Sequence, residues 1–123
     1  MTEMNSSQQD NIDSLPIMNR KDALDRLDNN TVLLDKIISM FMEKTPNELV
    51  KIEKLLEENN IDQIGFVAHT IKGTSAMIGA DRFSACALKI ERLAKQNSPK
   101  AEIEEKFQML KQIMNLLTDS LKT

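Results

Sequence analysis

Apolar residues recur at steps of three and four positions along most of this chain, which is the spacing of amphipathic helices. No segment alternates with a period of two, so no strand is predicted. The spacing, with its capping and turn residues, predicts helices over residues 19–27, 31–57 and 61–78, another from about residue 81 onward, and a last helix capped by Ser98 with Pro99 at its first position.

Four of these helices are substantial and are joined by short turns. The chain is therefore expected to be all-α, an antiparallel four-helix bundle with a short additional N-terminal helix across one end. Pro46 removes a backbone donor and should kink the long helix near residues 42–45 or split it in two. Residues 1–14 are polar and are expected to form a flexible N-terminal tail, followed by a single domain over residues 15–123.

Composition excludes several classes of function. A net charge of −3 and an aromatic share of 3% argue against nucleic-acid binding, which needs clustered cations and stacking platforms. No apolar run is long enough to span a membrane and no signal peptide precedes the helices, so a cytoplasmic protein without membrane contact is expected. Cys86, the single cysteine, offers neither a disulfide nor a metal cluster, and no metal site is expected.

The single histidine, His69, lies in the run A-H-T-I-K-G-T-S-A-M-I-G-A that ends at Ala80. On a helix it points about 150° away from the mean direction of the neighbouring apolar residues, so its imidazole should face solvent. Gly65 and Gly73 lie one turn to either side on nearly the same line, although a glycine costs about 1 kcal/mol in a helix interior. This combination indicates close approach by another molecule.

This run, followed by Phe83, Ala87, Ile90 and Glu91, resembles the signature of histidine-containing phosphotransfer (HPt) domains of multistep two-component phosphorelays. The stretch R-K-D-A-L-D-R-L-D-N-N-T-V-L-L-D-K-I-I-S-M-F extends the resemblance over the chain from about residue 19 onward. The resemblance implies that His69 carries the phosphoryl group. A neutral imidazole is a suitable nucleophile towards phosphorus near neutral pH, which agrees with that role.

The resemblance implies roles for three further residues. Lys72 would offset the charge of the phosphoryl group, Gly73 would leave room for that group and the partner, and Glu91 would hydrogen-bond the ring and orient it. Each also has a plainer explanation, respectively a solvated lysine, a glycine for tight helix packing and an ordinary surface glutamate. Lys95 either adds positive potential near the site or pairs with Glu91 four residues earlier.

Apolar side chains beside His69 indicate a surface for partners. Phe66 and Met77 project on the His69 side of the helix, which is typical of a transient docking patch and equally compatible with a wider buried face. Gly65, Ala76 and Lys95 complete the expected partner-binding residues.

Together these features predict a phosphocarrier without its own turnover, since no Gly-rich loop or nucleotide-binding motif supplies an ATP site. The receiver domain of a hybrid sensor kinase would donate the phosphoryl group and the receiver domain of a response regulator would accept it. No cofactor is expected, because Mg²⁺ would be held by the acidic residues of the receiver. A monomer is expected, either free-standing or as a module of a hybrid kinase.

Two alternatives stay open at this point. The first is an HPt-like adaptor of the same fold that binds or sequesters a receiver domain without transfer. The second is the dimerisation and phosphoacceptor domain of a histidine kinase. That class has an acidic residue directly after its histidine, where this chain has Thr70.

Overall fold

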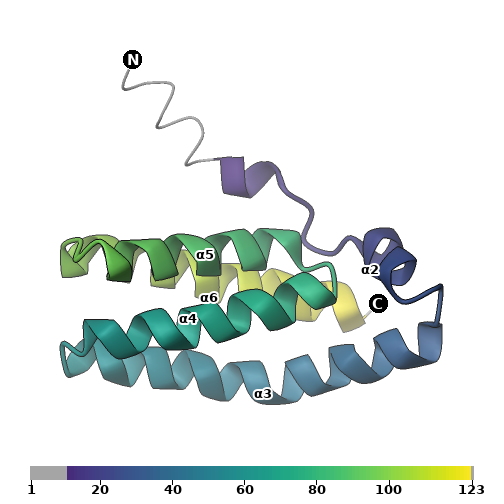
Figure 1. Cartoon of the computed structure of the whole chain (residues 1–123), viewed down its shortest axis with the longest axis horizontal. Helices are drawn as coiled ribbons and strands as arrows, with labels where there is room; N and C mark the ends of the chain where they lie inside the picture. The colour runs from purple at the N-terminus through teal and green to yellow at the C-terminus, as the bar shows by residue number, and fades with distance from the viewer. Residues whose placement is uncertain (1–10, 123) are drawn as a thin grey trace.

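The computed structural model describes residues 11–122, and every regular element in that part of the chain is a helix (Figure 1). In chain order the elements are the 3₁₀ helix η1 (Asn11–Ser14) and the α-helices α2 (Arg20–Arg26), α3 (Thr31–Glu57), α4 (Ile61–Met77), α5 (Asp81–Lys95) and α6 (Lys100–Lys122). The predicted all-α class is confirmed.

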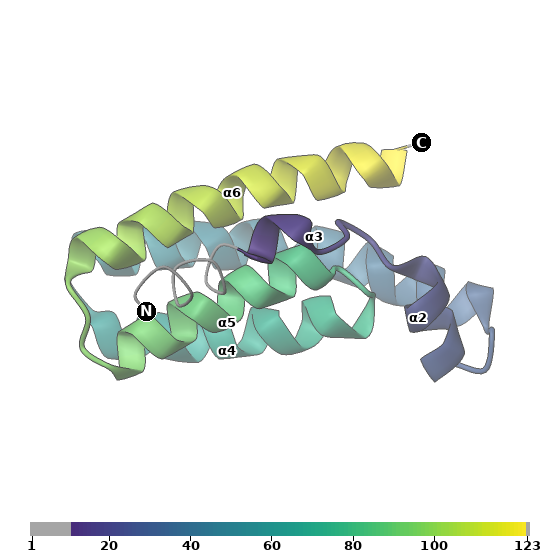
Figure 2. The ribbon, with the colours of Figure 1, turned by 90° about the horizontal axis from the view of Figure 1, so that it is seen from above.

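The four long helices run up and down in sequence and form one bundle (Figures 1 and 2). α4 packs between α3 and α5, and α6 packs on α5 and closes the bundle against α3. α2 lies across the end of the bundle where α3 begins and α4 ends. The predicted antiparallel four-helix bundle with a short additional helix is confirmed.

Asparagines mark the starts of three helices. The Oδ1 atoms of Asn19, Asn30 and Asn60 accept hydrogen bonds from the backbone N–H three residues later, at 3.1, 3.0 and 3.4 Å. Each bond satisfies a backbone donor that has no partner inside its own helix. Asn59 and Asn97 lie just beyond the ends of α3 and α5 with φ of 58° and 54°, the left-handed conformation that ends many helices. These residues fix the lengths of the helices and hence the register of the bundle.

Two prolines bear on the predicted course of the helices. α3 runs unbroken through the exposed Pro46, so of the two predicted outcomes, a kink or a split, the split is excluded. α6 begins at Lys100, one residue later than predicted, and the Pro99 carbonyl accepts a hydrogen bond from the N–H of Glu102 at 3.0 Å. This i to i+3 contact has 3₁₀ geometry, which is common in the first turn of a helix.

The core fills the space between the four long helices. Phe41 of α3 and Phe83 of α5 meet edge to face at its centre, with ring centroids 5.6 Å apart. The largest fully buried side chains are Phe83, Phe107, Leu34, Ile52, Ile64, Ile71, Ile78, Ile90, Ile103, Leu110, Leu117 and Cys86. Every long helix contributes to this set, so the outer faces of α4 and α5 are left to carry polar groups.

The N-terminal segment differs from the predicted tail. Residues 1–10 lie outside the described residues, but residues 11–14, which were expected to be flexible, form η1 against α5 with Ile12 buried. One apolar side chain among polar neighbours gives no periodic signal, which is why the sequence did not predict this contact.

Residues 15–19 continue as a strap over the turn between α4 and α5. Arg82 donates from its backbone N–H to the carbonyl of Pro16 at 3.0 Å and from Nε to the carbonyl of Leu15 at 2.9 Å. The backbone N–H of Asn19 donates to the carbonyl of Gly79 at 2.7 Å. The strap therefore satisfies backbone groups at both sides of the turn, where α5 lacks a side-chain cap.

Candidate functional site

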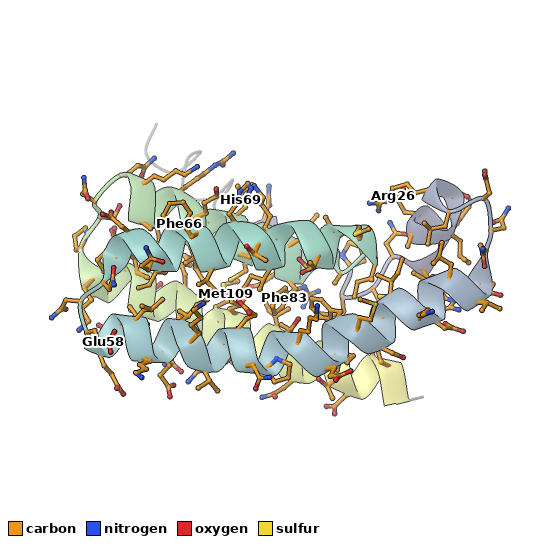
Figure 3. The ribbon with its side chains drawn as sticks, turned by 60° about the horizontal axis from the view of Figure 1, so that its bottom comes forward. Arg26, Glu58, Phe66, His69, Phe83 and Met109 are labelled. Carbon is orange, nitrogen blue, oxygen red and sulfur yellow. The ribbon has the colours of Figure 1, made fainter. Side chains whose placement is uncertain are left out.

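His69 lies in the middle of α4, and 64% of its side chain is exposed, as the helical geometry predicts. Figure 3 shows His69 and Phe66 along one outer edge of α4, while Phe83 points into the bundle. The neighbouring buried residues Ile64, Val67, Ala68 and Ile71 hold α4 against the core. The ring is therefore presented on a rigid helix and not on a loop.

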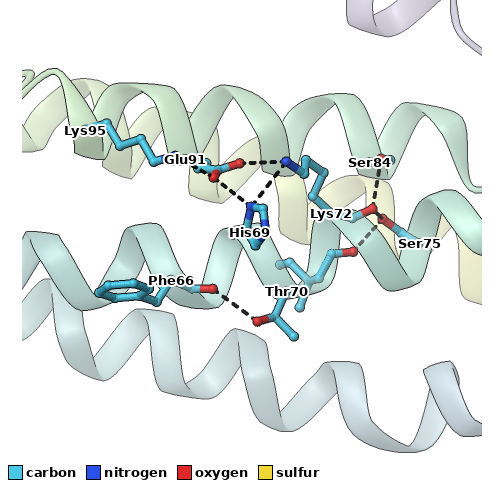
Figure 4. A network of polar contacts seen from close by, with 9 residues as sticks. Phe66, His69, Thr70, Lys72, Ser75, Ser84, Glu91 and Lys95 are labelled. Carbon is cyan, nitrogen blue, oxygen red and sulfur yellow. Dashed lines mark hydrogen bonds and ion pairs between the residues drawn. The ribbon is translucent and has the colours of Figure 1, made fainter.

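Glu91 of α5 contacts the ring of His69 from the neighbouring helix. Its side chain is 4% exposed, and its Oε2 lies 2.8 Å from Nδ1 of His69 (Figure 4). The same oxygen is 3.0 Å from Nζ of Lys95, and Oε1 is 3.0 Å from Nζ of Lys72. Glu91 is thus not an ordinary surface glutamate, because its buried carboxylate joins two lysines and the imidazole.

The surroundings of Glu91 keep its carboxyl ionised. Burial raises the pKa of this group, but hydrogen bonds from Lys72, Lys95 and His69, together with the charge of Lys72, outweigh burial and lower the pKa of Glu91 to about 2. The carboxylate is consequently a hydrogen-bond acceptor for the ring throughout the physiological pH range.

The contacts of Nδ1 indicate which ring nitrogen carries the proton. Nδ1 of His69 lies 2.8 Å from a carboxylate oxygen of Glu91, which can only accept, and 3.3 Å from the ammonium of Lys72, which can only donate. A bare Nδ1 would set its lone pair against the carboxylate at the shorter distance, whereas Lys72 already donates to Oε1 of Glu91. We therefore assign the proton to Nδ1 and the lone pair to Nε2. Nε2 has no hydrogen-bond partner among residues 11–122.

A surface depression of about 440 Å³ adjoins the ring between α4 and α5. Its lining consists of Asp62, Gly65, Phe66, His69, Glu91, Ala94 and Lys95. The small residues on its floor bring the two helices close together, since a Cβ on Gly65 would lie 3.4 Å from Cβ of Ala94. The site thus combines an exposed imidazole, a buried carboxylate in contact with it and space beside the ring.

Comparison with protein families gives a match to the Hpt domain family over residues 36–120. This chain belongs to the Hpt domain family. Hpt domains are phosphocarrier modules that interact with receiver domains, so the protein takes part in a phosphorelay. Comparisons with curated proteins and with solved structures found no match.

The two glycines near the histidine of this Hpt domain differ in their surroundings. A Cβ on the exposed Gly73 would meet nothing within 4 Å, so tight helix packing does not explain this glycine. Gly65 is buried against α5, which corrects the expectation that both glycines lie on the exposed line of His69. The interhelical approach shifts Gly65 from the open surface to the floor of the depression.

The apolar residues expected to contact partners lie at the surface of the Hpt domain. Phe66 is 67% exposed and Met77 is 52% exposed, so the alternative of a wider buried face is wrong for both. Ala76 is half-buried, and its carbonyl accepts a hydrogen bond from Arg26 of α2 at 2.8 Å. A second depression of about 240 Å³ between α3 and α4 includes Thr70 and Met77 in its lining.

Ser84 is a site residue that sequence reasoning missed. Its hydroxyl, on α5, donates to the backbone carbonyl of Lys72 at 3.1 Å (Figure 4). Ser75 donates to the same carbonyl at 3.0 Å and to that of Ile71 at 2.6 Å. These hydroxyls fix the backbone that carries Lys72 relative to α5. Serines inside amphipathic helices are common, so nothing in their spacing indicated this role.

The described residues also bear on metal binding, membrane spanning and thiol reactivity. Among residues 11–122, no group of three or more histidine, cysteine, aspartate or glutamate side chains could hold a metal ion. In the same part of the chain, no helix has the length and apolar character needed to cross a membrane. Cys86 is buried, and burial, partly offset by Lys106, raises the pKa of its thiol to about 12.

Proposed function

We propose that His69 accepts a phosphoryl group from the aspartyl phosphate of a hybrid sensor kinase receiver domain and passes it to the receiver domain of a response regulator. The observation that carries this proposal is the contact between Nδ1 and the buried carboxylate of Glu91 at 2.8 Å, combined with a ring that is 64% exposed. An exposed ring whose inner nitrogen is held by an anion has its outer nitrogen free for attack.

The transfer step needs one nucleophile and no cofactor from this chain. The lone pair of Nε2 forms a bond to phosphorus, and the bond between phosphorus and the aspartyl oxygen breaks with its electron pair going to the departing carboxylate. The ring, which keeps its proton on Nδ1, becomes positively charged, and the Glu91 carboxylate stabilises that charge. Return of the phosphoryl group to a second aspartate reverses these steps.

Lys72 and Gly73 support the same step from α4. Nζ of Lys72 lies 3.3 Å from Nδ1 of His69, so a rotation of this side chain can bring its ammonium to the phosphoryl oxygens. Gly73 leaves open space one turn beyond the ring, which a receiver surface can occupy. Mg²⁺, which assists transfers of this kind by neutralising phosphoryl charge, would be held by acidic residues of the receiver.

We also propose that the protein acts as a monomer in the cytoplasm. His69, Lys72, Glu91 and Lys95 all come from one chain, so one copy suffices to build the site. A single buried cysteine fits a reducing compartment. Light scattering of the purified protein should give the mass of one chain, and a stable dimer mass would contradict the proposed monomer.

The decisive experiment mixes the protein with a receiver domain carrying radiolabelled aspartyl phosphate. We expect label on this chain that is acid-labile and base-stable, and its onward transfer to a second receiver. His69→Gln should take no label, whereas Gln63→Leu, an exposed change elsewhere on α4, should transfer normally. If the wild type binds the phosphorylated receiver but stays unlabelled, the protein is an adaptor and the carrier proposal is wrong.

A further inference from the structure

Three positively charged or hydrogen-donating groups compete for one buried anion beside His69. Lys72 and the imidazole approach the carboxylate of Glu91 from α4, and Lys95 approaches it along α5, at 3.0, 2.8 and 3.0 Å. Asp62 is a further charged residue on the lining of the adjoining depression. Lys95 and the ring of His69 contact the same oxygen, Oε2. The interaction of Oε2 with Lys95 therefore weakens its interaction with the ring, and the reverse also holds.

The proton on Nδ1 controls how easily phosphorus leaves Nε2. When the phosphorylated ring carries this proton, cleavage of the P–N bond returns an electron pair to Nε2 and releases a neutral imidazole. When the proton is absent, the same cleavage must release an imidazolate anion, which is a much poorer leaving group. A negative charge at Nδ1 therefore favours release, and positive charges that neutralise it oppose release.

We propose that the negative charge of Glu91, which His69, Lys72 and Lys95 partly neutralise, sets the lifetime of the phosphoryl group on His69. The inference rests on the proposed function, since it concerns the phosphorylated form of the same residue. In the absence of a receiver, water attacks phosphorus, the P–N bond breaks and its electron pair returns to Nε2. Inorganic phosphate and an imidazole protonated on Nδ1 are the products.

Two substitutions separate the charge of Glu91 from its shape. Glu91→Gln keeps an oxygen that can accept from Nδ1, so a purely orienting role would survive, but it removes the negative charge. Lys95→Gln removes a cation that competes for Oε2 and leaves Glu91 in place. The Lys95 side chain is 71% exposed, so its replacement does not open the core.

The experiment phosphorylates each protein with phosphoramidate, a small phosphoryl donor, and follows loss of phosphohistidine by ³¹P NMR across a range of pH. Loss should slow as the pH rises through the titration of the phosphorylated ring. For Glu91→Gln we expect this slowing at a pH lower by about one unit than in the wild type, so that phosphohistidine persists longer near neutral pH. For Lys95→Gln we expect a smaller displacement towards higher pH.

Opposite displacements in the two variants would support the inference, and coincident pH profiles of wild type and both variants would overturn it. A displacement in the same direction for both variants would also overturn it. The two substitutions remove charges of opposite sign, so a shared direction would have to come from an effect other than charge, such as a loss of packing. If Glu91→Gln fails to fold, as judged by circular dichroism, Lys95→Gln alone decides. If the wild type takes phosphate neither from phosphoramidate nor from a phosphorylated receiver, that result instead contradicts the proposed function.

Discussion

Glu91 is the residue on which the electrostatics of the site depend. Its pKa of about 2 in the folded protein lies below the ordinary value of 4.5, so the folded state disfavours protonation of this carboxyl. The stabilisation is fully present above the ordinary value and is lost as the pH falls towards the folded value. Because the side chain is nearly buried, its contribution reaches about 3 kcal/mol at most.

This linkage predicts that the free energies of unfolding of wild type and Glu91→Gln become more similar as the pH falls. In urea unfolding the wild type should be more stable near neutral pH, and the gap in free energy should shrink as the pH falls from about 5 towards 2. Other carboxyls titrate in both proteins, so the difference isolates Glu91. A gap that stays constant over this range would contradict the prediction.

Two substitutions of Gly73 test different properties, Gly73→Ala the stability of the protein and Gly73→Leu its phosphoryl transfer. Gly73→Ala adds a Cβ that meets nothing within 4 Å, and it should stabilise the exposed helix by about 0.5–1 kcal/mol in urea unfolding. Gly73→Leu should slow phosphoryl transfer from a receiver because its side chain stands in the path of approach. Gln63→Leu, with similar bulk at an exposed position outside both depressions, serves as the control.

Normal transfer by a well-folded Gly73→Leu protein would contradict the clearance role of this glycine.

At the level of single residues, the sequence predicted which side of a helix a side chain faces better than it predicted how deeply that side chain is buried. The 100° step of a helix was enough to predict that His69 faces outward, because only the neighbouring apolar residues had to be known. The burial of Glu91 was not predictable, since glutamate is rarely buried and the cations that make burial tolerable come partly from another helix. The convergence of two lysines on one carboxylate likewise depends on the packing of α4 against α5.

The turn between α4 and α5 is the element most sensitive to a single substitution. Gly79 has φ of 77°, and a Cβ there would clash with the backbone carbonyl oxygen of Asn19. Gly79→Ala should therefore lower the free energy of unfolding by about 1–3 kcal/mol or more, from backbone strain and displacement of the strap. Urea unfolding beside Gly73→Ala, which should change stability in the opposite direction, checks this prediction. Equal stability of Gly79→Ala and wild type would contradict it.

Helix boundaries were largely predictable because local chemistry sets them. The asparagines at positions 30 and 60 precede α3 and α4, and both predicted starts agree with the structure. The strap was not predictable, because its hydrogen bonds run from backbone carbonyls of Leu15 and Pro16 to a residue 66 or more positions away in the chain. Contacts of this kind carry no pattern along the sequence.

The stability of the whole molecule depends on residues outside the range 36–120 that matches the Hpt family. Deleting residues 1–18 removes the buried Ile12 and the two carbonyls that bind Arg82, and we expect it to cost about 2–4 kcal/mol in free energy of unfolding. Deleting residues 1–10 keeps those contacts and provides the control. Indistinguishable stability of the two deletion variants in urea would show that the strap contributes nothing.

The antiparallel bundle was predictable because four amphipathic helices joined by short turns have few other ways to bury their apolar faces. The arrangement that was not predictable, η1 and the strap over one end, depends on a single buried isoleucine and on backbone polar groups. The packing that forms the 440 Å³ depression also depends on which helix lies beside Gly65. Such features follow from the assembled fold and not from any one segment.

The cap of α3 at Asn30 has a practical consequence for protein engineering. A graft trimmed to the matched range would begin at residue 36, inside this helix, and would lose its first turn together with α2 and the strap. Chimeric signalling proteins that borrow this module should place their fusion joint ahead of residue 11, so that the transplanted bundle brings its own end closure.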